Sequence, residues 1–352
     1  MVNTQPATGT SSGNRALTPD TANMIGPSEP VTTWQGWQHF ATSPPPAPPQ
    51  PGKAARSTEE RLAYHSAFVT VRTPAIDTLA HHVRTLMILG RHQTTTARPS
   101  LIVTGPAAAG KTTALLHVGR TCHLAHTQRN PAPSGRRHAQ VPVAYVLVPP
   151  GATAKTLTTE FARYLGIPVT TRMTQAQITD AVCHTYNTAG VQLVLIDEIH
   201  RLNPRTTTGA QAADLLKDLT ERIHATFVYA GIDVTTTPLF SGVRGAQLAG
   251  RATLITCGPL PARHGQTRPF TDVITDLENA LDLTSHRPGT LPRHATYLHQ
   301  RTAGRIGSLT RLIRQAAITA ITDGTEKITK VTLDAVQLDH LAEQQSRPTR
   351  TR

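Results

Sequence analysis

Short runs of apolar residues alternate in the middle of the chain with segments whose apolar residues recur every three or four positions. The runs predict strands, at 101–104, 141–148, 192–196, 226–229 and 252–256. The periodic segments predict helices between them, at 111–126, 154–166, 175–188 and 209–223. Strands that are apolar along their whole length are typical of a parallel sheet covered on both faces. The pattern therefore predicts a three-layer α/β core over residues 99–260.

The pattern changes on both sides of this core. Residues 57–98 predict a helical lead-in to the first strand. Residues 261–342 predict helices only, and the clearest of them runs from Ser308 to Ile321. Residues 343–352 form a polar, basic tail. We therefore expect an all-helical lid domain to follow the sheet.

The first 56 residues predict a disordered arm. They are rich in Ser, Thr, Gly, Asn and Pro, and the proline-rich run from Pro44 to Pro51 predicts an extended spacer. Trp34, Trp37 and Phe40 stand just before that run. Two interpretations of these aromatic residues stay open, a docking motif for a partner protein or a small local cluster.

The junction between the first strand and the first helix of the core reads LIVTGPAAAGKTT, from Leu101 to Thr113. It contains G-x-x-x-x-G-K-T, and backbone N–H groups of such a loop cradle phosphates at a helix N-terminus. Lys111 is expected to reach the β- and γ-phosphates, and the hydroxyl of Thr112 to reach Mg²⁺. The expected nucleotide contacts are Gly105, Pro106, Ala107, Ala108, Ala109, Gly110, Lys111, Thr112 and Thr113.

Two carboxylates follow the third predicted strand, in Leu193-Val194-Leu195-Ile196-Asp197-Glu198. In a fold with a phosphate-binding loop, this strand end is where the metal ion and the attacking water meet the γ-phosphate. Asp197 is expected to hold Mg²⁺ together with Thr112, and Glu198 to activate the water. The chain has no guanine-reading motif, so the sequence predicts a Mg²⁺-dependent ATPase.

Charge and cysteine content indicate which kind of partner and which cellular compartment to expect. The chain has 352 residues and a formal net charge of +13, which favours acidic partners such as nucleic acid. Biased composition is the alternative explanation of the many arginines. Three widely separated cysteines indicate no disulfide framework and predict reduced thiols in the cytoplasm. No apolar run is long enough to predict a membrane span.

With these motifs in place, the chain resembles the TniB branch of the AAA+ transposition ATPases, which is related to TnsC and to MuB. The blocks that carry the resemblance are GPAAAGKTTAL, VLIDEIHRL, TFVYAGIDV, LFSGVRGAQLAGRATLI and YLHQRTAGRIGSLTRLIRQAAITAI. The resemblance implies an ATPase that assembles as a ring or helical filament on duplex DNA, without sequence preference. It also implies target selection and activation of a partner DDE-type transposase, with hydrolysis of ATP taking the assembly apart.

The resemblance also suggests roles for residues outside the two motifs. ATPases of this kind complete each site with an arginine from a neighbouring subunit, and Arg251, just before the last strand, is the first candidate. Lys155 and Arg172, between the second and third core strands, are candidate contacts to the DNA backbone.

One departure from the family pattern leaves alternatives open. The fourth strand does not end in the expected Asn or Thr that would touch the γ-phosphate or the water. A scaffold that binds ATP and barely hydrolyses it therefore remains an alternative, as does a helicase-like or clamp-loader-like ATPase.

Overall fold

The computed structural model describes residues 29–50, 55–67, 71–92, 98–130, 140–202, 206–236, 240, 246, 248–265, 268–340 and 342–343. Its centre is a sheet of five strands within these ranges, all of them parallel: β1 (Ser100–Gly105), β2 (Val143–Leu147), β3 (Leu193–Asp197), β4 (Thr226–Ile232) and β5 (Ala252–Thr256). The strand order is β2-β3-β4-β1-β5. The predicted α/β core is thereby confirmed.

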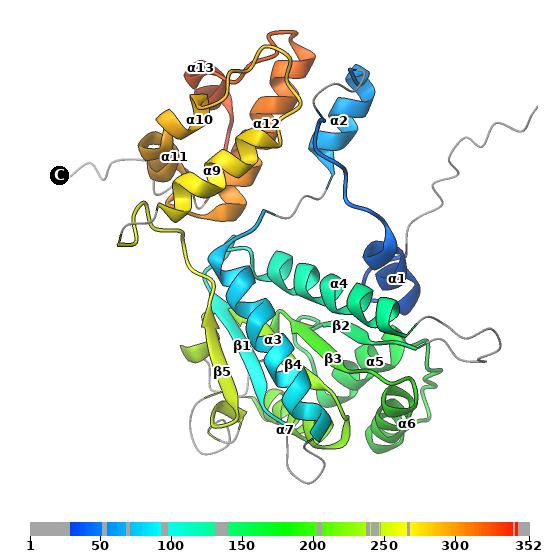
Figure 1. Cartoon of the computed structure of the whole chain (residues 1–352). Helices are drawn as coiled ribbons and strands as arrows, with labels where there is room; N and C mark the ends of the chain where they lie inside the picture. The colour runs from blue at the N-terminus through cyan, green and yellow to red at the C-terminus, as the bar shows by residue number, and fades with distance from the viewer. Residues whose placement is uncertain are drawn as a thin grey trace, which may run out of the picture.

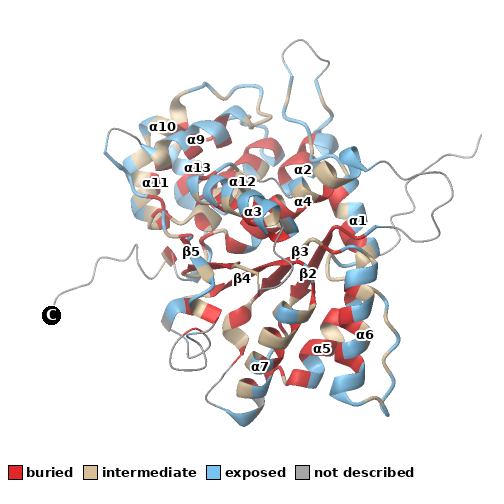
Figure 2. Ribbon diagram, turned by 60° about the horizontal axis from the view of Figure 1, so that its bottom comes forward, coloured by how far each residue is buried: buried red, intermediate tan, exposed pale blue. Residues whose placement is uncertain are grey.

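Helices cover both faces of this sheet (Figures 1 and 2). One layer contains α3 (Pro74–His92) and α4 (Lys111–Arg129), which contact each other and strands β1 and β4. The other contains α5 (Ala154–Tyr164), α6 (Gln175–Thr188) and α7 (Thr207–Arg222), which also contact one another. Every residue of β1 and β3 is buried, as expected for strands between two helical layers.

A second hydrophobic cluster lies in the C-terminal helices, drawn from yellow to red in Figure 1. These are α9 (Pro269–Asn279), α10 (Thr290–Arg293), α11 (Ala295–Thr302), α12 (Ile306–Thr322) and α13 (Lys330–Ala335). Leu309, Leu312 and Ile313 of α12 are almost completely buried in it. This confirms the helical C-terminal region that the sequence predicts, and α12 begins two residues before the expected Ser308.

The expected disordered arm contains an ordered helix. Residues Trp34–Thr42 form α1, which packs on α4, and Trp37 in it has no exposed surface. Sequence reasoning missed this helix because its burial depends on a surface of α4 that lies far along the chain. Residues 1–28 of the arm lie outside the described residues, as does most of the predicted basic tail.

The two helices of the predicted lead-in pack in different places. Helix α3 covers the sheet, whereas α2 (Thr58–Ser66) contacts α12 of the lid (Figure 1). Arg61 of α2 forms a bidentate pair with Glu326 at 2.6 and 2.7 Å, and the Tyr64 hydroxyl donates to the Ala280 carbonyl. Helix α2, which precedes the α/β core in the chain, therefore packs against the helical domain that follows the core.

We expect Arg61→Ala to loosen α2 from the lid, because the substitution leaves the half-buried Glu326 without its strongest donor. The local opening free energy of α2 should fall by about 2 kcal/mol, or roughly thirty-fold faster amide exchange. Hydrogen exchange followed by mass spectrometry measures this. Arg72→Ala, which breaks the exposed pair with Asp77, is the control and should change exchange little. Equal exchange in the two variants would contradict the role of the pair.

The same pair predicts a pH dependence of α2 docking. The hydrogen bonds from Arg61 lower the pKa of Glu326 below its usual value. A carboxyl group whose pKa is lowered by folding stabilises the folded state above its ordinary pKa. That stabilisation is lost as the pH falls through the lowered pKa, so acid should release α2 from the lid.

No helix in the described part of the chain is both long and apolar enough to span a lipid bilayer.

Candidate nucleotide-binding site

The site lies at the carboxyl edge of the sheet, next to the strand where the connectivity changes direction. Strand β1 lies between β4 and β5. After β1 the chain forms β2, β3 and β4 on one side of β1, and it then forms β5 on the opposite side. Ligands of open parallel sheets bind at such a switch point, beyond the carboxyl ends of the strands. The loop after β1 and the carboxylates after β3 both lie at this edge.

Two glycines make the loop after β1 possible. Gly105 has φ of 151°, and a Cβ atom there would lie 1.9 Å from the carbonyl oxygen of Cys257. Gly110 has φ of 85° and directly precedes α4 as its N-cap. Both dihedrals are readily available only to glycine. The loop between them therefore turns tightly enough to bring the N-terminus of a nineteen-residue helix to the site.

Lys111 is the buried cation of the loop. Its amine donates to the carbonyl oxygens of Gly105 and Pro106, at 2.8 and 2.7 Å. Burial lowers the pKa of this amine, and the negative charges of Asp197, Glu198 and Asp233 act in the opposite direction. Lys111 thus places a buried positive charge at the phosphate-binding loop, within the electrostatic influence of these three carboxylates.

The hydroxyl of Thr112 and the carboxylate of Asp197 are joined directly. Thr112 Oγ1 donates to Asp197 Oδ2 at 2.7 Å, and the Tyr145 hydroxyl of β2 donates to the same oxygen at 3.0 Å. The other carboxylate oxygen, Oδ1, accepts from the backbone N–H of Glu198 at 2.8 Å. Three donors therefore fix a carboxylate that is almost fully buried.

This donor set fits Mg²⁺, the ion that the sequence predicts. Mg²⁺ prefers oxygen ligands and usually keeps several waters, so one carboxylate, one hydroxyl and the phosphates of a nucleotide suffice. Thr112 and Asp197 present the required oxygens side by side at the N-terminus of α4. No cluster of three or more His, Cys, Asp or Glu side chains among the described residues offers a different kind of metal site.

Glu198 lies in a strained backbone conformation at the end of β3. Its φ and ψ are 61° and 33°, the left-handed region that non-glycine residues seldom adopt. Such strain is concentrated at functional sites, where the surrounding structure holds it in place. The conformation follows directly after the buried strand, so the side chain leaves the sheet at its carboxyl edge.

One oxygen of the Glu198 carboxylate faces two basic side chains. Arg201 Nη2 lies 3.1 Å from Oε2, and His200 Nε2 lies 3.6 Å from the same atom. Arg201 also donates to the Val148 carbonyl just after β2, and His200 Nδ1 accepts from the Ile232 N–H at the end of β4. These contacts orient the carboxylate from both neighbouring strands, and within the described part of the chain no donor contacts Oε1. Sequence reasoning gave Arg201 and His200 no role.

The lid touches the phosphate-binding loop. The N–H of Gly307, in the first turn of α12, donates to the Ala108 carbonyl at 3.0 Å. A cavity beside this contact is lined by Thr73, Ala75, Gly110, Thr113, Cys257 and Ile306, among others. Arg305, the N-cap of α12, keeps two buried nitrogens, Nε and Nη1, without a hydrogen-bond partner among the described residues. A buried guanidinium of this kind is suited to an anion.

Strand β4 is followed by an aspartate, where the family pattern predicts an amide or hydroxyl side chain at the strand end. It runs to Ile232, and the exposed Asp233 follows with φ of 43°. The N–H of Val234 donates to Thr104 Oγ1 in β1, which fixes this turn beside the phosphate-binding loop. The absence of Asn or Thr noted in the sequence therefore leaves Asp233 at that strand end.

The remaining predicted site residues lie away from this cluster. Arg251 is exposed just before β5, where its carbonyl accepts from the Ser100 N–H and its guanidinium lies 3.5 Å from Glu221 of α7. Lys155 is exposed in the first turn of α5, and Arg172 is exposed in the turn before α6. Arg251 is thus at the edge of the sheet opposite to the nucleotide loop.

Sequence comparison identifies the family. The family model described as "Bacterial TniB protein" matches residues 61–251, which is more than half of the chain. This chain belongs to the TniB family. The resemblance seen in the motifs is thereby confirmed, and the match includes both the phosphate-binding loop and the Asp197-Glu198 pair. No curated protein matches the chain in sequence.

Solved structures show that this TniB-family chain has the AAA+ fold. It is similar to the Aeropyrum pernix Orc1 protein in complex with DNA, with a TM-score of 0.56, 16% identity, and coverage of 77% of this chain and 66% of that one. It is also similar to Cdc6p from Pyrobaculum aerophilum, with a TM-score of 0.52, 15% identity, and coverage of 75% and 66%. The chain thus spans slightly less than two thirds of these relatives.

Proposed function

We propose that this TniB-family protein is an ATP-dependent, DNA-binding regulator of transposition. It binds Mg²⁺·ATP, assembles on duplex DNA as a ring or helical filament, selects the target and activates a partner DDE-type transposase. ATP hydrolysis then takes the assembly apart. The observation that carries the proposal is the cluster of Lys111, Thr112, Asp197 and Glu198 at the carboxyl edge of the sheet of a TniB-family chain.

The geometry of the cluster supports ATP hydrolysis, with a separate role for each of its residues. Lys111 and the backbone N–H groups of the loop bind the phosphates. Thr112 and Asp197 hold Mg²⁺, which when bound neutralises charge on the β- and γ-phosphates. Glu198 accepts a proton from the attacking water through Oε1, while Arg201 and His200 hold Oε2. Arg305 adds positive charge from the lid near the phosphates.

DNA binding is supported by the net charge of +13 and by the exposed position of Lys155 and Arg172. Lys155 lies in the first turn of α5 and Arg172 in the turn before α6, and both are exposed to solvent. Contacts to phosphates alone carry no sequence information, which fits an assembly that forms on any duplex.

The binding proposal is tested by titrating fluorescent duplex DNA with the protein in ATP, in ADP and without nucleotide. We expect binding to require ATP and to weaken steeply with salt. Lys155→Ala combined with Arg172→Ala should lower the slope of log affinity against log salt by about 1.8, because each lost phosphate contact contributes about 0.9. Lys327→Ala, which removes an exposed lysine from the lid, should leave the slope unchanged. DNA binding that is equal in all three nucleotide states would contradict the proposal.

A further inference from the structure

The N-terminal helix α1 is anchored to the hydrophobic core by the side chain of Trp37. The indole of Trp37 is fully buried against α4 at Gly119, where a Cβ atom would lie 2.6 Å from the ring. Any other residue at Gly119 would push the indole away. The aromatic ring therefore occupies a space that α4 leaves open for it, and it is not offered to another protein.

Further contacts hold α1 in this place. The Thr33 hydroxyl caps its N-terminus by accepting from the Gly36 N–H at 3.2 Å. At its other end, Arg120 of α4 donates to the carbonyl oxygens of Ala41 and Ser43, at 3.0 and 2.8 Å. Both ends of the short helix are thus fixed, so the position of Trp37 along α4 is fixed as well.

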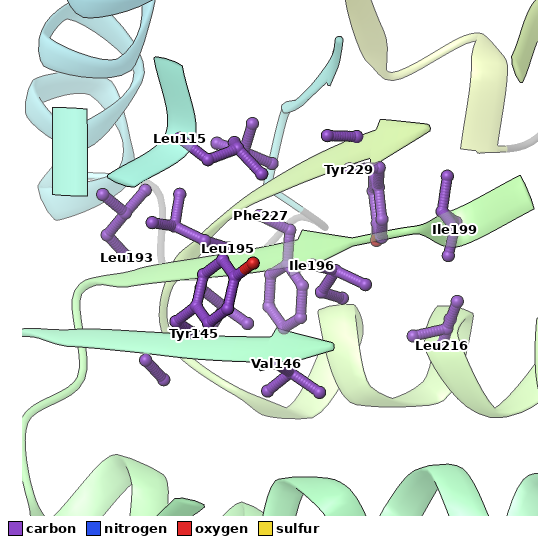
Figure 3. Close-up of a cluster of buried hydrophobic side chains, with 14 of the residues drawn as sticks. Leu115, Tyr145, Val146, Leu193, Leu195, Ile196, Ile199, Leu216, Phe227 and Tyr229 are labelled. Atoms are coloured by element: carbon purple, nitrogen blue, oxygen red, sulfur yellow. The ribbon is translucent and has the colours of Figure 1, made fainter. Parts of the chain in front are cut away.

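Trp37 reaches the nucleotide site through one intermediate residue. Its ring stacks on Tyr145, with centroids 6.1 Å apart and planes 16° apart. Figure 3 shows Tyr145 on β2, among the buried side chains of the neighbouring strand such as Leu195. The Tyr145 hydroxyl donates to Asp197 Oδ2, the same oxygen that accepts from Thr112.

We propose that Tyr145 is a positioning residue for the Mg²⁺-binding carboxylate of Asp197, and that α1 holds Tyr145 in place through Trp37. Residues 30–43 then contribute to Mg²⁺ binding at the nucleotide site, although they do not contact the metal ion. This inference deepens the proposed function and rests on it for the binding of Mg²⁺·ATP only. It does not depend on DNA or on a transposase.

The physical reason is the number of donors on Asp197. Thr112 and Tyr145 bind Oδ2, and the Glu198 N–H binds Oδ1. The Thr112 hydroxyl is also expected to bind the metal ion. Of the two side-chain donors on Oδ2, Tyr145 is therefore the one whose expected role is only to hold the carboxylate. Residues that orient a metal-binding carboxylate in this way typically change metal affinity 10- to 100-fold when they are replaced.

The test measures ATP affinity with and without the metal. A fluorescent ATP analogue is titrated into the full-length protein in Mg²⁺ and in EDTA, and the ratio of the two dissociation constants gives the tightening caused by Mg²⁺. Tyr145→Phe should lower this ratio about tenfold, with the affinity in EDTA unchanged. Trp37→Ala should lower the ratio about fivefold, and Trp37→Phe should restore most of it because the ring still stacks on Tyr145.

Trp34→Ala is the matched control on the same helix, since Trp34 contacts His123 and not Tyr145. It should leave the ratio unchanged. Unchanged affinity in EDTA reports that each variant is folded. A wild-type ratio in Tyr145→Phe would overturn the positioning role of Tyr145. An equal decrease of the ratio in Trp34→Ala and Trp37→Ala would overturn the proposal that Trp37 holds Tyr145 in place. A protein that shows the expected ratios but no response to DNA would contradict the proposed function and leave this inference standing.

Discussion

Glu198→Gln is expected to lower the turnover of ATP by about 10²- to 10⁴-fold, the usual contribution of a general base. The amide keeps the size of the side chain and can still contact Arg201, but it cannot take the proton of the attacking water. ATP binding should persist, because Lys111, Thr112 and Asp197 are unchanged. Phosphate release at saturating ATP measures the loss, and a fluorescent ATP analogue measures the binding that remains.

A second consequence follows for DNA. If hydrolysis takes the assembly apart, the Glu198→Gln protein should stay on duplex DNA longer than the wild type does. Glu59→Gln, which neutralises an exposed carboxylate at the start of α2, is the matched control and should behave as the wild type. Turnover that survives Glu198→Gln would show that another group activates the water, and would remove Glu198 from the mechanism.

Arg251→Ala should lower the turnover of the assembled protein by about 10³-fold, in the range known for arginines that stabilise phosphoryl transfer from a neighbouring subunit. The reason is the position of Arg251 before β5, beside the first residue of β1. The nucleotide loop follows the last residue of β1, and six strand residues at about 3.3 Å each separate the two edges by roughly 20 Å. An arginine side chain cannot cross that distance, so the predicted role of Arg251 requires the nucleotide site of another subunit.

Mixing two inactive variants tests this directly. Lys111→Ala should lose ATP binding but keep its arginine, whereas Arg251→Ala keeps a complete nucleotide loop. In an equal mixture that assembles at random in a closed ring, about a quarter of the sites combine an intact loop with an intact neighbour. Turnover should therefore return to a measurable fraction of the wild-type value. Mixed assemblies that form on DNA and stay inactive would contradict a role of Arg251 in the neighbouring site.

The sheet and the core of the site could be predicted from sequence because their signals are local. Strand β3 is a run of apolar residues that ends in Asp197, and the strand and its carboxylates are adjacent in the chain. The loop from Gly105 to Thr112 likewise contains its own glycines, cation and hydroxyl. In such segments the residues that determine the conformation are the residues that carry the chemistry.

The parts that sequence reasoning missed depend on contacts between distant segments. Trp37 is buried only because α4 has a glycine at the point of contact, and the proline-rich sequence after α1 suggests disorder instead. Arg61 lies 265 positions from Glu326, so nothing near either residue indicates that α2 belongs against the lid. Such pairings follow from the packing of the whole chain and leave no periodic pattern.

Tyr145 was missed for a different reason. It occupies one position of an apolar strand, where an aromatic residue is an ordinary choice for a sheet. Only the register of β2 against β3, which pairs Tyr145 with Leu195, brings its hydroxyl to Asp197 two residues farther along. Polar groups on buried strands need a partner, and this rule is the signal that could have directed attention to Tyr145.

The most direct test of the central claim is steady-state ATP hydrolysis, measured with and without duplex DNA at low and at high salt. We predict that duplex DNA raises turnover at low salt, that high salt removes the stimulation, and that Lys111→Ala and Glu198→Gln abolish it. A wild-type protein that binds Mg²⁺·ATP but turns it over at the same background rate with and without DNA would contradict the account. That result would favour a scaffold switched by ATP binding alone.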